Sequence, residues 1–177
     1  ILDALHDSKI KLILTRHEQG AIHMADGQAR ATGKAGVALV TSGPGALNAI
    51  TGILTAQMDS VPLVVICGQT ITANLGLDAF QEADVSGVSY AVTKHSYLAK
   101  NASDLPRIMK EAFFLAESGR PGPVLIDVPK DVSSALIEPN YDVPVELPGY
   151  KLPGKPDKKG LKAMADMLTK AQKPVLL

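Results

Sequence analysis

The sequence has few of the residues that tie small domains together or carry them into a membrane. Cys67 is its one cysteine among 177 residues, which excludes a framework of disulfide bonds within the chain. No apolar stretch reaches the ~18–20 residues that a membrane span needs, and the longest, Val61–Gly68, is the length of a strand. No signal peptide is visible at the amino terminus. We therefore expect a cytoplasmic protein without a membrane segment. Because the chain starts at Ile1 without a Met, we also expect it to be cut at both ends.

An excess of either charge is also missing. Lys and Arg number 18 and Asp and Glu number 18, which argues against a nucleic-acid partner. The sequence contains neither a Walker loop nor a Gly-x-Ser-x-Gly elbow. Its four histidines and Cys67 have no metal-ligand spacing, so we expect no metal site in this chain. What is present is enough apolar sequence, 46%, for a packed core.

Short apolar runs alternate with helical patterns along the chain. The runs are continuous, which is typical of parallel strands that helices bury on both faces. Strands are predicted at Lys11–Thr15, Val37–Thr41, Pro62–Cys67, Tyr97–Ala99 and Val124–Val128. Helices are predicted at Glu18–Thr32 (ending at Gly33), Gly45–Met58, from an N-cap at Ser103 to Ser118, and at Lys158–Ala171. This order predicts a three-layer, doubly wound α/β domain with a mostly parallel sheet and helices on both faces.

A change of composition near residue 139 divides the chain. Four prolines fall between residues 140 and 157, with Pro139 beside them, which favours an extended linker. We predict one domain over residues 1–138, a Pro-rich linker over 139–157, and the truncated start of a second α/β domain over 158–177. The last segment would hold a basic amphipathic helix and a strand that begins at Lys173.

Polar clusters stand at the ends of the predicted strands. They are Arg16–Gln19, Thr41–Asn48, Asp78–Glu82, Ser118–Pro123 and Asp127–Asp131. We expect all of them on one edge of the sheet, the edge where open α/β sheets bind ligands. Glu18 fits a helix-capping acid or a catalytic carboxylate. The Gly43-Pro44-Gly45 turn fits a phosphate site or a tight turn that needs glycine. Cys67, inside an apolar run, fits a small buried hydrophobe.

Taken together, these segments resemble the large catalytic subunits of the acetolactate synthase (acetohydroxyacid synthase) family, which depend on thiamine diphosphate. RHE at residues 16–18 and TSGPG at 41–45 are found across thiamine diphosphate enzymes. DAFQE at 78–82, TKHSY at 93–97, GRPGPV at 119–124 and DVPKD at 127–131 narrow the resemblance to acetolactate synthase. The resemblance covers essentially the whole chain and implies the N-terminal pyrimidine-binding domain.

The resemblance assigns roles to matching residues. Glu18 is similar to the glutamate that hydrogen-bonds N1′ of the aminopyrimidine and favours the tautomer whose 4′-nitrogen takes the thiazolium C2 proton. Pro44 and Asn48 resemble the turn that packs on this ring, which would replace phosphate as its ligand. Phe80 and Gln81 resemble the pair lining the reaction cavity, with Gln81 near the reactive end of the cofactor. Lys130 and Lys94 resemble lysines of the substrate and inhibitor channel, and Ser60 and Arg120 resemble contacts to FAD.

The resemblance also implies the rest of the enzyme. It would condense two pyruvates, or pyruvate and 2-oxobutyrate, with loss of CO₂ in branched-chain amino-acid biosynthesis. Mg²⁺ ligands would lie in a C-terminal domain, FAD would be structural, and the subunit would form a homodimer or homotetramer, possibly with a regulatory small subunit. The fragment alone would be inactive. The alternatives are another thiamine diphosphate carboligase or decarboxylase, such as the catabolic acetolactate synthase, and a non-catalytic domain that binds a nucleotide or anion.

Overall fold

One parallel sheet organises the molecule in the computed structural model, which describes residues 1–138 and 140–175. Its strands are β1 (Gly36–Val40), β2 (Leu63–Gln69), β3 (His95–Leu98) and β4 (Pro123–Pro129). They pair in the order β1-β2-β4-β3, and every pairing is parallel. The α/β prediction with a parallel sheet is therefore confirmed.

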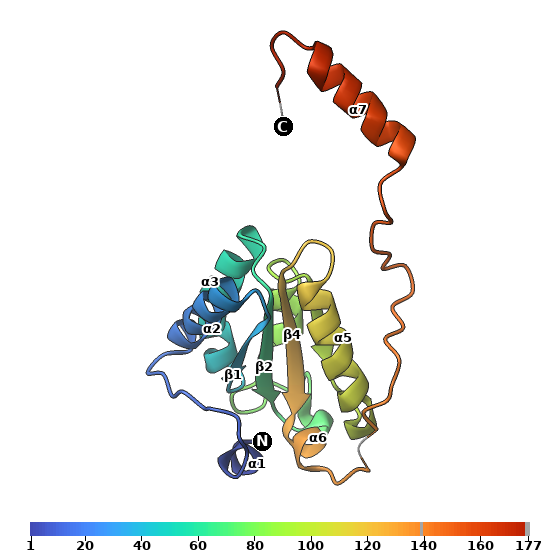
Figure 1. Cartoon of the computed structure of the whole chain (residues 1–177). Helices are drawn as coiled ribbons and strands as arrows, with labels where there is room; N and C mark the ends of the chain where they lie inside the picture. Colours follow the sequence, from blue (N-terminus) through green and yellow to red (C-terminus); the bar gives the residue numbers. More distant parts are fainter. Residues whose placement is uncertain (139, 176–177) are drawn as a thin grey trace.

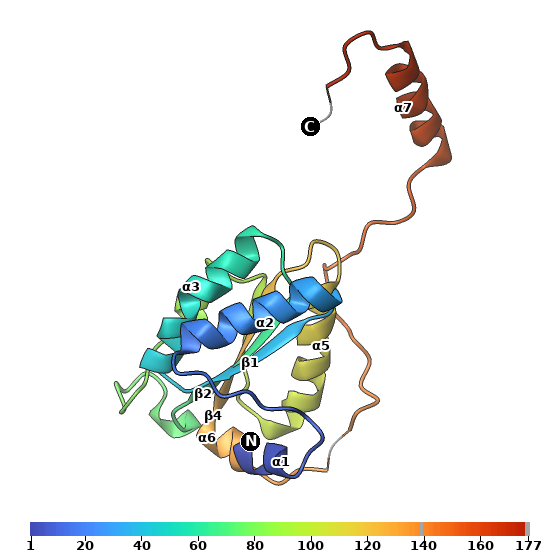
Figure 2. The same cartoon turned by 60° about the vertical axis from the view of Figure 1, so that its left-hand side comes forward.

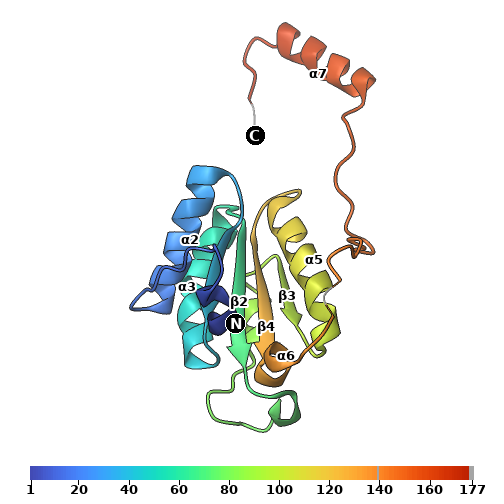
Figure 3. The ribbon, with the colours of Figure 1, turned by 60° about the horizontal axis from the view of Figure 1, so that its bottom comes forward.

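Helices cover both faces of this sheet (Figures 1 and 3). Helices α2 (Glu18–Thr32) and α3 (Pro44–Met58) lie on one face, and α5 (Leu105–Glu117) lies on the other. The remaining helices are α1 (Leu2–His6), η1 (Thr72–Asn74), α4 (Val85–Ser89), η2 (Ala102–Asp104), α6 (Lys130–Ser134) and α7 (Lys158–Lys170). The predicted helices at 18–32, 45–58 and 158–171 are thus present within a residue of their expected bounds.

Alternate side chains of β2 enter two separate hydrophobic cores. Leu63, Val65 and Cys67 belong to the core beneath α2 and α3, whereas Val64 and Ile66 belong to the core with residues of α5. A strand buried on both faces needs apolar residues at every position, which explains its continuous apolar run. Cys67 is fully buried, as expected for a small hydrophobic residue.

The predicted strand at Lys11–Thr15 is absent, and this prediction was wrong. The segment forms no ladder, and its side chains are exposed, with Leu14 at 94%. In Figure 2 it runs as an extended coil that leads into α2. An apolar run becomes a strand only where a sheet edge pairs with it, because the ladder supplies its backbone hydrogen bonds. The composition of residues 11–15 shows an apolar run, but it does not show whether a sheet edge pairs with that run.

One of two predicted helix ends differs from the structure. Helix α2 ends at Gly33 in the left-handed conformation (φ 69°), as predicted. Ser103, however, is not the N-cap of α5, because it lies inside η2 and the helix begins at Leu105 after Asp104. The Asp104 N–H donates to the Asn101 carbonyl and closes this 3₁₀ turn, which moves the helix start past Ser103.

The predicted linker leaves the sheet domain beside α5 (Figure 1). Leu147 and Tyr150 pack against the core on that side. Helix α7 has no buried residue and stands apart from the sheet in each view (Figures 1–3). Pro139, where the linker was predicted to start, and Leu176–Leu177 of the predicted final strand lie outside the described residues. The boundaries of the linker and second domain stay predictions.

Among the described residues, no helix is both long enough and apolar enough to cross a membrane.

Two helical glycines allow a matched test of the packing between α2 and α3. A Cβ at Gly52 of α3 would lie 2.8 Å from Cβ and Cγ2 of Ile22, whereas a Cβ at Gly27 of α2 would meet nothing within 4 Å. We expect Gly27→Ala to raise the free energy of unfolding by about 0.5–1 kcal/mol through helix propensity. Gly52→Ala should lower it by about 1–3 kcal/mol through overpacking. Urea denaturation of the 177-residue chain measures both. Equal effects would contradict the close approach of α2 to α3.

Candidate functional site

The carboxyl edge of the sheet gathers the residues that follow β1, β2 and β4. Glu18 is the first residue of α2 and is half-buried. Its Oε2 accepts a hydrogen bond of 3.1 Å from Nδ2 of Asn48, which lies in the second turn of α3. The two residues are 30 positions apart in sequence. The fold thus joins the RHE segment to the glycine turn that follows β1.

The Glu18 carboxylate lies directly over Gly45. A Cβ on Gly45 would stand 3.1 Å from Oε1 of Glu18 and 2.5 Å from Cγ2 of Thr41. A hydrogen bond from its own backbone N–H, followed by the one from Asn48, holds the pKa of Glu18 below its ordinary value. The glutamate is therefore ionised at neutral pH and partly open to solvent. A carboxylate held in this way can accept a hydrogen bond from a ligand at the sheet edge.

The turn before α3 has a second close neighbour in the loop after β2. Gly43 has φ 51°, and a Cβ there would fall 2.3 Å from the carbonyl oxygen of Gln81. Only glycine permits this approach of two backbones. Glu18, Gly43–Gly45, Asn48 and the backbone of Gln81 consequently form one cluster.

Two other predicted residues lie at the same edge without joining this cluster. Phe80 is 89% exposed, and Lys130 is an exposed residue at the start of α6. No hydrogen bond from the Lys130 ammonium to the Glu18 cluster is found in the described residues, and the Phe80 ring has no group that could form one. Both side chains lie at the surface.

The expectation that all polar clusters share one edge was wrong. Ser60 precedes β2, Lys94 precedes β3 and Arg120 precedes β4, so all three lie at the amino ends of parallel strands. Glu18 and Asn48 lie at the opposite edge. A residue before a strand and a residue after it are separated by the full strand length, so the Ser118–Pro123 cluster with Arg120 cannot share the edge of the other four clusters.

Ser60 and Arg120 are nonetheless brought together. Nε of Arg120 donates to Oγ of Ser60 at 2.7 Å, across 60 positions of sequence. Ser60 adopts a positive φ of 58°. Ser60 and Arg120, which the resemblance assigned to FAD, are therefore in direct contact.

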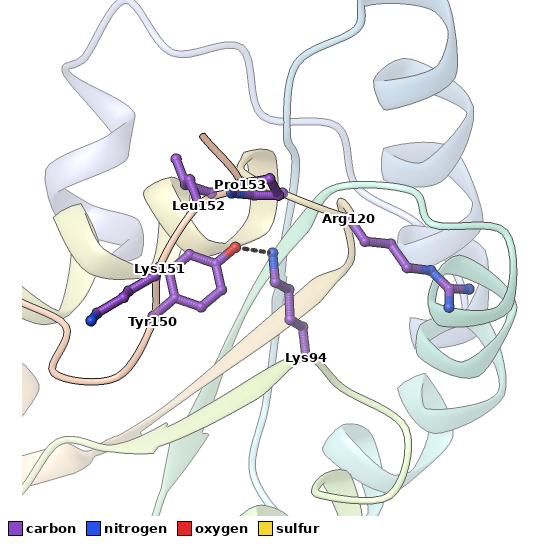
Figure 4. Close-up of a pocket in the computed structure, with 7 residues that line it drawn as sticks. Lys94, Arg120, Tyr150, Lys151, Leu152 and Pro153 are labelled. Atoms are coloured by element: carbon purple, nitrogen blue, oxygen red, sulfur yellow. Dashed lines mark hydrogen bonds between the residues drawn. The ribbon is translucent and has the colours of Figure 1, made fainter. Parts of the chain in front are cut away.

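Lys94 lies in a different arrangement, next to an open hollow of about 620 Å³ (Figure 4). Its Nζ donates to the carbonyl oxygens of Leu115 and Ser118 and to the hydroxyl of Tyr150, the last at 2.8 Å. An ammonium has three donors, so these acceptors use all of them. Figure 4 shows Arg120 extending away from this pair. Tyr150 could not be predicted as a partner of Lys94 from the sequence, because the two residues lie in distant segments.

A buried polar cluster under the carboxyl edge was also missed. Asp127 of β4 is 2% exposed and accepts hydrogen bonds from Gln69 Nε2 (3.0 Å) and Cys67 Sγ (3.4 Å). Burial raises the pKa of Asp127 to about 6, against the lowering effect of these two donors. Gln69 also donates to the carbonyl of Ala83, which ties the loop after β2 to the sheet. The residue types alone do not reveal such a cluster.

Among residues 1–138 and 140–175, no three His, Cys, Asp or Glu side chains are grouped in a way that would hold a metal ion.

Comparison with known proteins agrees with this arrangement. Residues 1–88 match the family model described as thiamine pyrophosphate enzyme, N-terminal TPP binding domain. The chain belongs to the thiamine pyrophosphate enzymes, whose cofactor is the same molecule as thiamine diphosphate.

More particularly, the chain is similar to acetolactate synthases from bacteria and plants. It is 52% identical to the isozyme 3 large subunit of Escherichia coli over 179 residues, which cover 99% of this chain and 31% of the relative. It is 49% identical to acetolactate synthase 3, chloroplastic, of Brassica napus over 171 residues, 96% of this chain and 26% of the relative. It is 48% identical to acetolactate synthase of Mycobacterium leprae, over 97% of this chain and 27% of the relative. The chain thus spans 26–31% of the length of these proteins and corresponds to their N-terminal part.

The raised pKa of Asp127 predicts a pH dependence of stability. The ordinary value is 3.8 and the folded value about 6, so the folded state binds this proton more tightly than the unfolded state. The free energy of unfolding should therefore fall as the pH rises from about 4 to about 6, by on the order of 3 kcal/mol, and then stay level. In Asp127→Asn this component should vanish. Urea denaturation at several pH values compares the two chains, and a difference independent of pH would contradict the assignment.

The contacts of Lys94 predict a structural role. Lys94→Met removes the ammonium that donates to the Leu115 carbonyl and to the Tyr150 hydroxyl, and leaves the Ser118 carbonyl with its hydrogen bond from Tyr150. We expect the free energy of unfolding to fall by about 1–3 kcal/mol. Lys151→Met, a change of an exposed lysine beside the same hollow, should stay within about 0.5 kcal/mol of the wild type. Equal effects of both changes in urea denaturation would show that the Lys94 contacts contribute nothing.

Proposed function

We propose that the chain is the pyrimidine-binding part of an acetolactate synthase large subunit. The observation that supports this proposal most is the Glu18 carboxylate, held by Asn48 over the Gly43–Gly45 turn. In the whole subunit the reaction would join two pyruvates, or pyruvate and 2-oxobutyrate, with release of CO₂, for branched-chain amino-acid synthesis. Residues 1–138 would form this domain, 139–157 a linker, and 158–177 the start of the next domain.

The described residues fit an aminopyrimidine at this place. A flat ring needs a carboxylate for its ring nitrogen and an apolar surface beside it. Glu18 supplies the carboxylate, and Pro44, exposed between the buried Gly43 and Gly45, supplies the apolar surface. Asn48 fixes the orientation of the carboxylate by donating to one oxygen. A ligand that needs one acceptor and a small apolar contact matches this set of groups.

Glu18 would act by holding a proton at a defined atom. Thiamine diphosphate, when bound, supplies the carbon nucleophile that adds to a 2-oxoacid. The carboxylate would form a hydrogen bond with N1′ of the aminopyrimidine and share its proton. Its pKa is lowered in the open chain. A ring laid over it would remove water and favour the protonated form, which raises the pKa toward the working range of a general acid–base group.

The residues at the surface of this edge would complete the reaction cavity. We propose that Gln81 lies near the reactive end of the cofactor, that Phe80 lines the cavity, and that Lys130 stands at its entrance. The exposure of Phe80 supports a surface that another body covers. The active site would then form between two subunits of a homodimer or homotetramer.

FAD and Mg²⁺ belong to other parts of the proposed protein. The Arg120–Ser60 pair at the amino edge offers charged and hydroxyl donors for FAD. Lys94 lies at this edge too, opposite the entrance proposed at Lys130, and its ammonium donates to Leu115, Ser118 and Tyr150. Mg²⁺ would be held in the C-terminal domain. The words "large subunit" in the name of the E. coli relative support a smaller partner subunit. A cytoplasmic location stays a prediction, since the Brassica napus relative is named chloroplastic.

Glu18→Gln in the full-length subunit tests the proposal. The amide keeps the shape of the side chain but cannot hold the shared proton, so acetolactate formation from pyruvate should fall by roughly 10²–10⁴-fold. Thiamine diphosphate should still bind, as measured by calorimetry. The assay follows acetolactate with saturating thiamine diphosphate and Mg²⁺.

Glu117→Gln is the matched control for this experiment. Glu117 also bears a carboxylate that accepts a hydrogen bond, from the Ala35 N–H, but it lies at the end of α5. Its change to glutamine should leave the rate within about two-fold, because surface substitutions remote from a site have small effects. The isolated 177-residue chain, which would contribute Glu18 without metal ligands, serves as the inactive blank. Full activity of Glu18→Gln would reduce Glu18 to a helix-capping acid.

A further inference from the structure

We propose that Glu82 is a positioning residue, which anchors the loop carrying Phe80 and Gln81 against the glycine turn of the cofactor site. The inference rests on the proposed function for its effect on the reaction. Its structural part, that one carboxylate holds the loop to the turn, rests only on the contacts described here.

The carboxylate of Glu82 is surrounded by backbone N–H groups of its own loop. Oε1 accepts from the N–H of Gly76, and Oε2 accepts from the N–H of Ala79 at 2.8 Å. Hydrogen bonds from the N–H groups of Ala79 and Gly76 contribute most to holding the pKa of Glu82 below its ordinary value. The N–H groups of Leu77 and Asp78 lower this pKa further. The ionised side chain therefore links both ends of the segment 76–79 and closes it into a compact loop.

The backbone of this loop needs such an anchor. Asp78 and Gln81 both have φ of 55°, a region that residues with a Cβ seldom occupy, and Gly76 has φ of 81°. Residues in this region persist only where surrounding contacts hold them. The two carboxylate oxygens of Glu82 accept from the N–H of Gly76 and from that of Ala79, the residue after Asp78, and so supply those contacts.

The loop is tied to the rest of the fold on both sides of the Glu82 contacts. On one side, the backbone N–H of Thr72 donates to Oδ1 of Asp131 in α6 at 3.0 Å. On the other, Gln69 Nε2 donates to the carbonyl of Ala83 at 3.0 Å. Residues 75–82 form the part between these ties. Within that part, the Glu82 carboxylate accepts from the N–H of Gly76 and from the N–H of Ala79, which flank Leu77 and Asp78.

The effect reaches the cofactor turn through Gln81. Its carbonyl oxygen lies against Gly43, close enough that a Cβ on Gly43 would stand 2.3 Å from it. Gly43 precedes Pro44 and Gly45, over which the Glu18 carboxylate lies. Release of the loop would therefore remove the wall behind the glycine turn and displace the Gln81 side chain. Glu82 would act on the reaction through these neighbours and not by touching substrate.

The test compares Glu82→Ala and Glu82→Gln in the full-length subunit. Glutamine keeps one acceptor oxygen but faces the second N–H with a donor, so it should rescue the alanine variant in part. We expect kcat for acetolactate formation to fall in Glu82→Ala by on the order of 10- to 100-fold, the scale of a misplacement near 1 Å. The midpoint of thermal unfolding should change by a few degrees at most, because the loop is not part of either core. Glu117→Ala, which also removes a carboxylate bound to a backbone N–H, should leave kcat unchanged.

Two further readouts separate positioning from general stability. If Glu82 acts partly by placing the Gln81 side chain, the double variant Glu82→Ala with Gln81→Ala should lose less kcat than the product of the two single losses. In hydrogen exchange, Glu82→Ala should speed exchange in residues 75–83 and also in the turn at 41–48. Glu117→Ala should change neither segment.

The outcomes are decisive in either direction. Equal exchange at 41–48 in Glu82→Ala and the wild type would overturn the proposal, as would an additive loss in the double variant. If the wild-type subunit makes no acetolactate, the proposed function fails. Hydrogen exchange then still supports or overturns the anchoring of the loop by Glu82. If Glu82→Ala does not fold, exchange in Glu82→Gln decides in the same way.

Discussion

The parallel pairing of β2 with β4 is the constraint on which the rest of this molecule depends. Their register joins Leu63 to Pro123 and Gln69 to Pro129, which places the two strands side by side over seven residues each. Parallel strands cannot be joined by a tight turn, so each connection returns through a helix across one face of the sheet. All segments that follow strands then meet at one edge, and all that precede them meet at the other. This geometry places Asn48, which follows β1, at the edge opposite Arg120, and Glu18 at the start of α2 meets Asn48 there.

The same constraint explains which parts of the fold could be predicted from the sequence. Strands buried on both faces are mostly apolar, so β2 and β4 were visible as continuous runs. Helix α2 was visible from its length and its closing Gly33. The segment Lys11–Thr15 has the composition of a strand but forms none. Its composition does not show whether a neighbouring strand is available to pair with it. The start of α5 was misplaced for a similar reason, since the backbone contact of Asp104 with Asn101 decides it.

For the site, the glycine turn and Glu18 could be found because motif and position in the chain agree. Contacts across the sequence could not be found in this way. The hydrogen bond of Lys94 to Tyr150 crosses 56 positions, and that of Gln69 to Asp127 crosses 58. Neither residue pair has a spacing that signals chemistry. Lys94 shows the consequence: the resemblance implied a channel lysine, and the fold gives its ammonium three acceptors inside the domain.

Glycine controls how near the polar groups of the carboxyl edge come to one another. The Glu18 carboxylate approaches α3 because Gly45 has no Cβ, and the Gln81 carbonyl approaches the turn because Gly43 has none. Any side chain at either position would push one wall of the cluster outward. The two walls are held by different means: Asn48 holds the carboxylate through a side-chain hydrogen bond, and Glu82 holds the opposing loop through backbone N–H groups. The cluster therefore keeps its geometry even though much of it faces solvent. A ligand arriving at this edge would meet a surface already arranged and would lose less free energy in ordering it.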